Sequence, residues 1–167
     1  RGSSASDRKA VPSRIALTQA IGMALARRAR GEHVGLLFVD LDRFKPVNDL
    51  LGHDAGDELL VEVATRLSST VRASDTVARM GGDEFVVLAP RLVSSGALED
   101  LARRVERVIS EPFTLRAGVA SVTASVGAAI AEPQSDVASL LAEADQAMYQ
   151  VKSARRHGSA VQSRRWT

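Results

Sequence analysis

Four acidic residues stand in two short segments of the chain, and their chemistry suits a metal site. Asp40 and Asp42 follow a run of apolar residues, and Asp83 and Glu84 follow two consecutive glycines. Carboxylates that lie together raise each other's pKa unless a cation neutralises them, and hard oxygen ligands of this kind suit Mg²⁺ or Mn²⁺. Two-metal phosphoryl or nucleotidyl transfer uses such a cluster. The alternative is that these acids only end strands and face solvent.

Asn48 and Asp57 are candidates for recognising a base. A carboxylate can accept both the N1–H and the N2–H₂ of guanine, and an amide adds a donor and an acceptor. Asn48 also suits a turn, and Asp57 suits the first turn of a helix, where the dipole favours an acid. From the residues alone both interpretations stay open.

A buried strand is needed to position the first two acids. Residues 34–39 (VGLLFV) are continuously apolar and short enough for such a strand. Asp40 and Asp42 would stand at its end on alternate sides, so that only one of them needs to face a site.

A hairpin is predicted at the centre of the chain. Residues 76–78 and 85–88 are strand-like, and Gly81 and Gly82 between them indicate a tight connection with a primed turn. Pro90 is expected to close it.

The hairpin would bring Asp83 and Glu84 beside Asp40. Within a two-residue turn, Arg79 falls opposite Glu84. This position is compatible with an ordinary cross-strand ion pair or with a supporting role in the site.

Apolar residues recur at helical spacing in the remaining segments. The resulting order is helix, strand, helix, then the hairpin, then helix, strand, helix. This order predicts an α/β (α+β) sandwich of ferredoxin-like kind, a mixed sheet flanked by helices with a central β-hairpin, rather than a doubly wound parallel sheet. The expected helices are 13–30, one beginning at Asp54 as N-cap, 95–110 and 136–155, with a turn-rich 46–52 that has room for a short helix and a β-rich 120–130.

Composition indicates one soluble domain. The chain has 167 residues, 45% hydrophobic and 25% charged, and no Cys, which excludes thiol catalysis and thiolate metal sites and fits a cytoplasmic protein. No apolar run reaches the roughly 18 residues of a membrane span. We expect a linker or tag remnant over 1–11, one domain over 12–160 and a basic tail over 161–167, within a longer natural protein.

Charge is unevenly distributed, although the net charge is only +2. An acid-rich segment, 32–63, lies between a basic start and a tail from Val151 onward that contains five cations and no acid. This pattern fits a metal and phosphate site built from distant segments, although a solvated surface explains it equally.

Three ordered motifs resemble the GGDEF family of diguanylate cyclases, whose fold is like that of class III nucleotidyl cyclases. Residues 79–85 (RMGGDEF) are similar to the signature, and the similarity continues in 38–49 (FVDLDRFKPVND) and 52–57 (GHDAGD). Residues 144–152 (ADQAMYQVK) resemble the family's last helix. The resemblance covers about residues 12–157.

The resemblance implies a homodimer that condenses two GTP into cyclic di-GMP and two pyrophosphates, each subunit presenting one GTP to the other. It implies two Mg²⁺ (or Mn²⁺) per GTP, held by Asp40, Asp83, Glu84 and the Leu41 carbonyl. Asp83 and Glu84 would be catalytic, with Asp83 the candidate base for the 3′-hydroxyl unless metal activation serves instead.

The same resemblance assigns the nucleotide's other contacts. Asn48 and Asp57 would read guanine. The phosphates would be bound by Lys45, Lys152, Arg156 and the backbone at Gly81 and Gly82, where no Cβ blocks the approach. It also implies an upstream sensor domain in the natural protein, with no nucleic-acid partner and no membrane insertion of this part.

Arg72 and Asp75 match the family's RxxD site for product inhibition in their position along the chain. Five residues separate Asp75 from Gly81. Arg103 is similar to the secondary arginine that clamps the product from a neighbouring subunit. The alternative is a helix-ending cation followed by a turn-forming Asp.

Two departures from the family pattern stand out. In the family, a turn motif links the regulatory domain to the catalytic domain. Residues 6–14 (SDRKAVPSR) match only the last part of this motif. Arg155 stands where the family usually has Gly, whereas Lys152 and Arg156 are kept.

Two functions follow. The favoured one is a diguanylate cyclase with a full set of active-site residues. The alternative is a catalytically silent receptor that binds cyclic di-GMP or GTP through Arg72, Asp75 and Arg103 and regulates a partner domain. A receptor would not need the metal, guanine and phosphate residues together.

Overall fold

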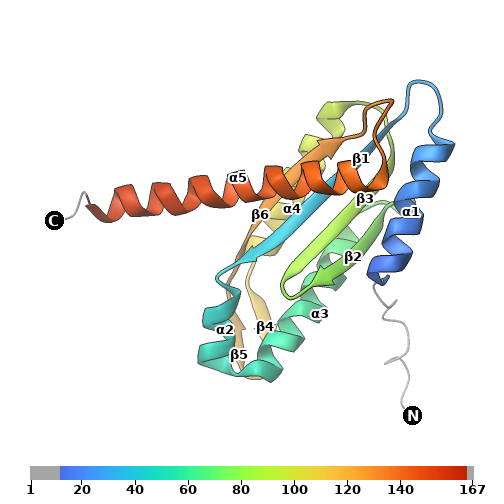
Figure 1. Cartoon of the computed structure of the whole chain (residues 1–167). Coiled ribbons are helices and arrows are strands. Elements are labelled where there is room, and N and C mark those ends of the chain that lie inside the picture. Colours follow the sequence, from blue (N-terminus) through green and yellow to red (C-terminus); the bar gives the residue numbers. More distant parts are fainter. Residues whose placement is uncertain (1–11, 165–167) are drawn as a thin grey trace, which may run out of the picture.

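A four-stranded antiparallel sheet forms the centre of the computed structural model, which describes residues 12–164, with side chains through Arg156 (Figure 1). The strand order is β2-β3-β1-β6, and each neighbouring pair is antiparallel. The strands are β1 (His33–Asp42), β2 (Thr76–Gly81), β3 (Glu84–Leu92) and β6 (Thr123–Ile130). The predicted linker over residues 1–11 and the end of the predicted tail, 165–167, lie outside the described residues.

β1 is buried on both faces because it lies between β3 and β6 and under helices on either side. Leu37, Val39 and Leu41 belong to one core cluster, and Leu36 and Phe38 belong to the other. Side chains two residues apart on a strand point to the same face. Asp40 and Asp42 therefore share the face of Phe38, and the expectation that they stand on alternate sides is wrong.

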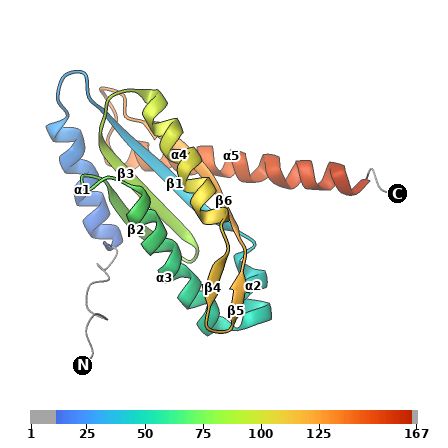
Figure 2. The same cartoon turned by 180° about the vertical axis from the view of Figure 1, so that it is seen from behind.

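Two layers of helices enclose the sheet. In Figure 1, α1 (Arg14–Arg27) and α5 (Val137–Arg164) lie on the near face, and Figure 2 shows α3 (His53–Thr70) and α4 (Ser95–Ser110) on the other. The short helix α2 (Phe44–Leu51) follows the end of β1. The predicted sandwich with a central hairpin is confirmed, but its sheet is antiparallel throughout instead of mixed. Among residues 12–164, no helix has the length and apolar character needed to cross a membrane.

Several predicted boundaries are wrong. α3 begins at His53 after Gly52, and Asp54 lies inside its first turn instead of capping it. Pro90 does not close the hairpin, because β3 continues to Leu92 with a register shift against β1 that accommodates a residue lacking an N–H. α5 runs past the expected end at Arg155 to Arg164.

A second, small hairpin is absent from the sequence prediction. It consists of β4 (Phe113–Leu115) and β5 (Gly118–Ala120), which are too short to show an alternating pattern. Arg66 of α3 fixes its start, because the guanidinium stacks 3.5 Å from the Phe113 ring centroid. The same guanidinium donates to the carbonyls of Val108, Glu111 and Pro112.

Gly127 lets α5 approach the sheet closely. A Cβ at this position of β6 would clash with the backbone nitrogen of Met148 and the carbonyl oxygen of Ala144, and would lie 2.6 Å from Met148 Cα. These are backbone atoms of a helix whose Leu140, Ala144 and Met148 are buried, so they cannot move without shifting the whole element.

Gly127→Ala is expected to lower the free energy of unfolding by about 3 kcal/mol, the upper end of what overpacking costs. Urea denaturation measures the change. Gly22→Ala on α1 is the matched control, because its new methyl meets only Val137 Cγ2, at 3.8 Å. The control should gain up to about 1 kcal/mol through helix propensity. A loss below about 1 kcal/mol in Gly127→Ala would contradict the close approach.

Candidate functional site

Three carboxylates meet at the adjoining ends of β1 and β3. Asp40 is the register partner of Glu84 across the two strands, and the Leu41 N–H donates to the Asp83 carbonyl at 3.2 Å. The prediction that the hairpin brings Asp83 and Glu84 beside Asp40 is confirmed.

The hairpin turn consists of Gly82 and Asp83, with Gly81 opposite Glu84. The sequence predicts a tight turn at Gly81 and Gly82, and the structure moves it by one residue, because Gly81 still pairs with Glu84. Gly82, the first residue of the turn, has a φ of +51°. Gly81 has a φ of +145°, which only glycine adopts readily. Both glycines are exposed beside Asp83.

Arg79 does not face Glu84 as the two-residue turn predicts. A register shift after Arg79 sets it opposite Phe85, and its Nε donates to the Gly82 carbonyl at 2.9 Å. Its contact in the structure is therefore with the backbone of the turn that carries Asp83.

The clustered carboxylates are electrostatically strained. Burial, followed by the charge of Asp40, raises the pKa of Asp83 and of Glu84 above their usual values. Lys152 opposes both shifts, by a smaller amount. A cation of higher charge between these groups would remove the repulsion.

Asp40 is the most buried member of the cluster, at 8% exposed. Its Oδ2 accepts from Lys152 Nζ at 2.9 Å, whereas its Oδ1 is buried and has no hydrogen-bond partner within the described part of the chain. An unpaired buried carboxylate oxygen next to two further carboxylates fits a hard divalent cation. Among residues 12–164, no three His, Cys, Asp or Glu side chains are already arranged around a common metal position.

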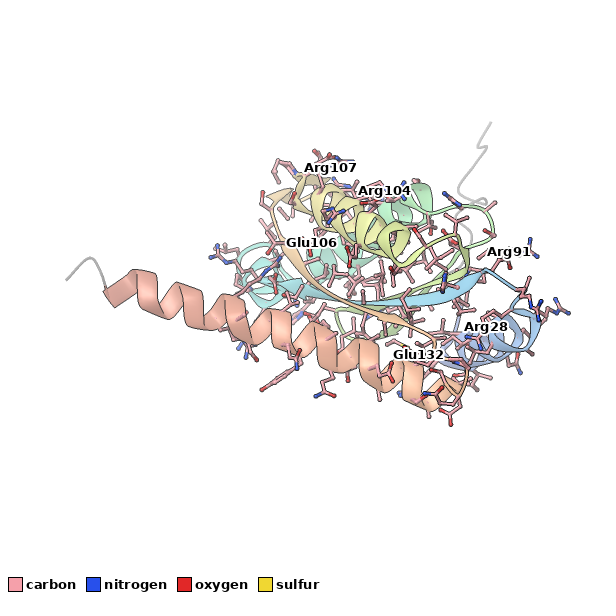
Figure 3. All side chains as sticks on the ribbon, turned by 90° about the horizontal axis from the view of Figure 1, so that it is seen from above. Arg28, Arg91, Arg104, Glu106, Arg107 and Glu132 are labelled. Carbon is pink, nitrogen blue, oxygen red and sulfur yellow. The ribbon has the colours of Figure 1, made fainter. Side chains whose placement is uncertain are left out.

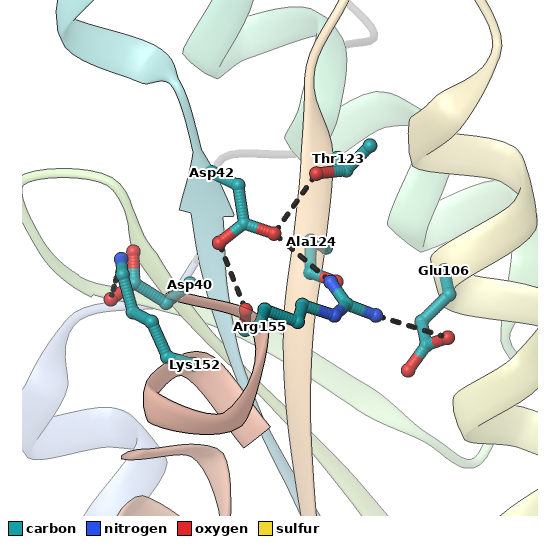
Figure 4. A network of polar contacts seen from close by, with 8 residues as sticks. Asp40, Asp42, Glu106, Thr123, Ala124, Lys152 and Arg155 are labelled. Atoms are coloured by element: carbon teal, nitrogen blue, oxygen red, sulfur yellow. Dashed lines mark hydrogen bonds and ion pairs between the residues drawn. The ribbon is translucent and has the colours of Figure 1, made fainter. Parts of the chain in front are cut away.

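Asp42 belongs to a polar network rather than to the carboxylate cluster (Figure 4). It accepts from Thr123 Oγ1 at 2.9 Å, Ser125 Oγ at 2.8 Å and Arg155 Nη1 at 3.0 Å. Arg155 Nη1 also donates to the Ala124 carbonyl at 2.6 Å, and Nη2 lies 3.7 Å from Glu106 Oε2.

The two residues predicted to bind guanine lie on neighbouring helices. Asn48 is on α2 with a buried Oδ1 that has no partner among the described residues, and Asp57 is exposed on α3. Gly56 makes room for the amide, because a Cβ there would clash with Asn48 Oδ1 and lie 2.8 Å from its Cγ. The two helices thus offer a buried amide oxygen without a partner and, separately, a solvent-accessible carboxylate.

A cleft of about 1290 Å³ is lined by the three cations predicted to bind phosphate, whereas Gly81 and Gly82, predicted for the same role, are not part of its lining. It opens between the β1–α2 turn, α4 and the C-terminal part of α5. Its lining includes Leu41, Lys45, Asp83, Lys152 and Arg156. Residues from the start, middle and end of the chain therefore meet at one concave surface.

The predicted product site is not assembled within one chain. Arg72 and Asp75 form a turn at the opposite end of β2 from Gly81, with the Arg72 N–H donating to Asp75 Oδ2 at 2.9 Å. Arg103 lies on α4, lines the cleft and pairs with Asp100.

Sequence reasoning missed residues that hold the site in place. Ser125 is fully buried in an otherwise apolar stretch of β6, and this interruption was a usable signal. Gly56 and the anchoring role of Arg155 depend on contacts between distant segments, and no local pattern reveals them.

Comparison with known proteins identifies the family. Residues 9–158 match the GGDEF family, described as diguanylate cyclase, GGDEF domain. The bifunctional diguanylate cyclase/cyclic di-GMP phosphodiesterase MucR of Pseudomonas aeruginosa is 39% identical over 150 residues, which are 89% of this chain and 22% of MucR. This chain belongs to the GGDEF diguanylate cyclase family.

Solved structures agree with this assignment. The GGDEF domain of TpbB (YfiN) from Pseudomonas aeruginosa superposes with a TM-score of 0.82 at 37% identity, covering 87% of this chain and 92% of that one. The GGDEF domain of DgcB from Caulobacter crescentus, in complex with c-di-GMP, gives a TM-score of 0.80 at 25% identity, covering 92% of each chain. This chain spans about a fifth to a third of the curated relatives' length.

Stability without metal is expected to depend on the strained carboxylates. Because the pKa of Glu84 is raised by folding, its contribution to stability is present below the ordinary pKa of about 4.3 and is lost as pH rises through the folded-state pKa. In EDTA at pH 7, Glu84→Gln should therefore unfold at a higher temperature than wild type, by about 1–2 °C because solvent screens the partly exposed group.

Differential scanning fluorimetry at pH 7 and pH 4 checks this. The difference in unfolding temperature between Glu84→Gln and wild type should disappear at pH 4. Glu99→Gln, which removes an exposed acid near the start of α4, is the matched control and should show no such difference. A variant less stable than wild type at pH 7 would contradict the assigned repulsion.

Proposed function

We propose that this chain is the catalytic domain of a diguanylate cyclase, which condenses two GTP into cyclic di-GMP and two pyrophosphates. The observation that carries the proposal is the convergence of three carboxylates at adjoining strand ends, one with an unpaired buried oxygen, beside a cleft lined by cations. A receptor that only binds a nucleotide has no need for such a costly cluster.

Asp40, Asp83, Glu84 and the Leu41 carbonyl would hold Mg²⁺ or Mn²⁺, two ions per GTP. The bound cations would neutralise negative charge on the phosphates during nucleotidyl transfer. The unpaired Asp40 Oδ1 and the raised pKa values of Asp83 and Glu84 support this fit.

In each half of the reaction, the 3′-oxygen of one GTP attacks the α-phosphorus of the other. A new P–O bond forms, the bond from the α-phosphorus to the pyrophosphate leaving group breaks, and the 3′-hydroxyl loses its proton. Asp83 is the candidate acceptor for this proton, because its carboxylate lies beside the cleft in which the nucleotide is proposed to bind. Activation of the hydroxyl by metal is the alternative route.

The remaining contacts orient the nucleotide. Asp57 accepts from guanine N1–H and N2–H₂, and the Asn48 amide binds the base from the neighbouring helix. The triphosphate lies along the cleft, where its charge meets Lys45, Lys152 and Arg156. The exposed turn at Gly81 and Gly82 leaves the backbone open to phosphate.

Catalysis requires a homodimer in this proposal, because one chain presents one GTP and the second copy presents the other. The curated relatives extend well beyond the matched part, which supports an attached sensor domain that promotes this dimer. Use of GTP and Mg²⁺ fits an enzyme that acts in the cytoplasm. Activity per mole of chain should therefore rise with chain concentration.

Incubation with GTP and Mg²⁺ at high protein concentration tests the proposal, with nucleotides resolved by chromatography. A parallel reaction contains a phosphodiesterase that removes cyclic di-GMP. Formation of cyclic di-GMP supports the cyclase. GTP binding without product at every protein concentration would favour the receptor.

Glu84→Ala is expected to reduce cyclic di-GMP formation by about 10³-fold or more, because it removes a carboxylate from the charge-compensated centre. The initial rate of product formation measures the change, and circular dichroism checks the fold. Glu99→Ala, the same change on an exposed position, should retain wild-type turnover. Wild-type turnover in Glu84→Ala would refute the assignment.

Arg72→Ala is expected to weaken product inhibition, with the inhibition constant rising about tenfold or more because a charge-assisted phosphate contact is lost. Initial rates at increasing cyclic di-GMP measure this. Arg30→Ala, which removes an exposed cation between α1 and β1, should leave inhibition unchanged. Inhibition that is identical in Arg72→Ala and wild type would mean that the Arg72–Asp75 turn is only a surface turn.

A further inference from the structure

The contacts of α5 with the sheet change character along the helix. Its first part is held by buried apolar residues, ending with Met148 at 4% exposed. Beyond Met148, polar contacts tie α5 to the rest of the fold, among them the ion pair of Lys152 with Asp40 and the Arg155 network. Figure 1 shows the helix continuing past the end of the sheet from this region.

Arg155 reaches three elements at once. It binds Asp42 of β1 and the Ala124 carbonyl of β6 through Nη1, and its Nη2 approaches Glu106 of α4 (Figure 4). Thr123 donates to the same Asp42 oxygen as Arg155 and Ser125 donates to the other oxygen, so the carboxylate that receives Arg155 is itself fixed. A planar guanidinium suits this arrangement because its donors diverge in a rigid fork.

The Lys152 contact cannot play the same role during binding. Its partner Asp40 is one of the carboxylates assigned to the metal. A divalent cation bound to Asp40 would repel the Lys152 ammonium, whose Nζ lies 2.9 Å from Asp40 Oδ2. Lys152 is also assigned to the phosphates, so it must exchange Asp40 for the nucleotide. Arg155, whose partner lies outside the carboxylate cluster, is not subject to this exchange.

We propose that Arg155 is a positioning residue that keeps the phosphate-binding turn of α5 docked on β1 and β6 while Lys152 moves from Asp40 to the nucleotide. This inference rests on the proposed assignment of Lys152 and Arg156 to GTP phosphates. Arg155 itself touches no substrate in this account. It acts by fixing the helix turn from which both cations extend.

The test uses Arg155→Ala, Arg155→Lys and a control, Arg28→Ala. Arg28 also clamps carbonyls, those of Ala131 and Glu132, but at the end of the molecule away from the free end of α5 (Figure 3). Two quantities are measured for each protein: backbone hydrogen exchange, both in EDTA and with saturating analogue and Mg²⁺, and the Kd of that non-reacting analogue, guanosine 5′-(α,β-methylene)triphosphate, with Mg²⁺. Neither measurement depends on turnover.

Arg155→Ala should accelerate exchange over residues 149–156 by about tenfold without changing the sheet, and should raise the Kd about tenfold. Arg155→Lys should lie between Arg155→Ala and wild type in both measurements. Lysine restores a positive charge beside Asp42 but lacks the diverging donors of a guanidinium. Arg28→Ala should leave both quantities near wild type. Asp42→Asn provides a second route to the same loosening and should act in the same direction.

The possible failures are distinguishable. If Arg155→Ala leaves exchange over 149–156 unchanged, or loosens the helix without changing the Kd, the positioning role is overturned. If wild type binds the analogue but makes no cyclic di-GMP from GTP, the proposed function fails, and the exchange and binding results still decide the role of Arg155.

Discussion

Repulsion among Asp40, Asp83 and Glu84 is the constraint around which the site is built. The antiparallel pairing of β1 with β3 forces these carboxylates together, and burial raises the pKa of Asp83 and Glu84 further. The sheet tolerates this because its centre is held by apolar packing on both faces of β1. The core thus offsets the cost of a charge cluster, which in the proposed function a cation and an anionic ligand would compensate.

α5 supplies the opposite charge from the other end of the chain. Its approach depends on Gly127, whose missing side chain allows the helix backbone to rest against β6, and on the polar network that receives Arg155. Gly127 in β6 and Arg155 on α5 therefore both hold α5 against the sheet. Together they set the position of Lys152 relative to Asp40, and this position defines the cationic side of the cleft.

The sequence predicted the sandwich, the central hairpin and the convergence of Asp40 with Asp83 and Glu84, because strand periodicity and turn glycines are local signals. It failed where tertiary contacts decide the outcome. Arg79 lies opposite Phe85 instead of Glu84 because of a register shift in the hairpin. The alternate sides expected for Asp40 and Asp42 were a different error, because the local two-residue repeat of a strand already places them on one face. The space beside Asn48 depends on Gly56 from another helix, which no pattern within α2 encodes.

The two matched ion pairs between α5 and β1 also determine the direction of the helix. Asp40 and Asp42 are two strand residues apart, about 6.7 Å, whereas Lys152 and Arg155 are three helical residues apart, about 4.5 Å along the axis. These unequal spacings are compatible with a helix that crosses the strand obliquely, as in Figure 1. The helix then continues past the sheet to Arg164, and Lys152, Arg155 and Arg156 line the cleft beside its departure, so one helix both packs on the sheet and forms a wall of the cleft.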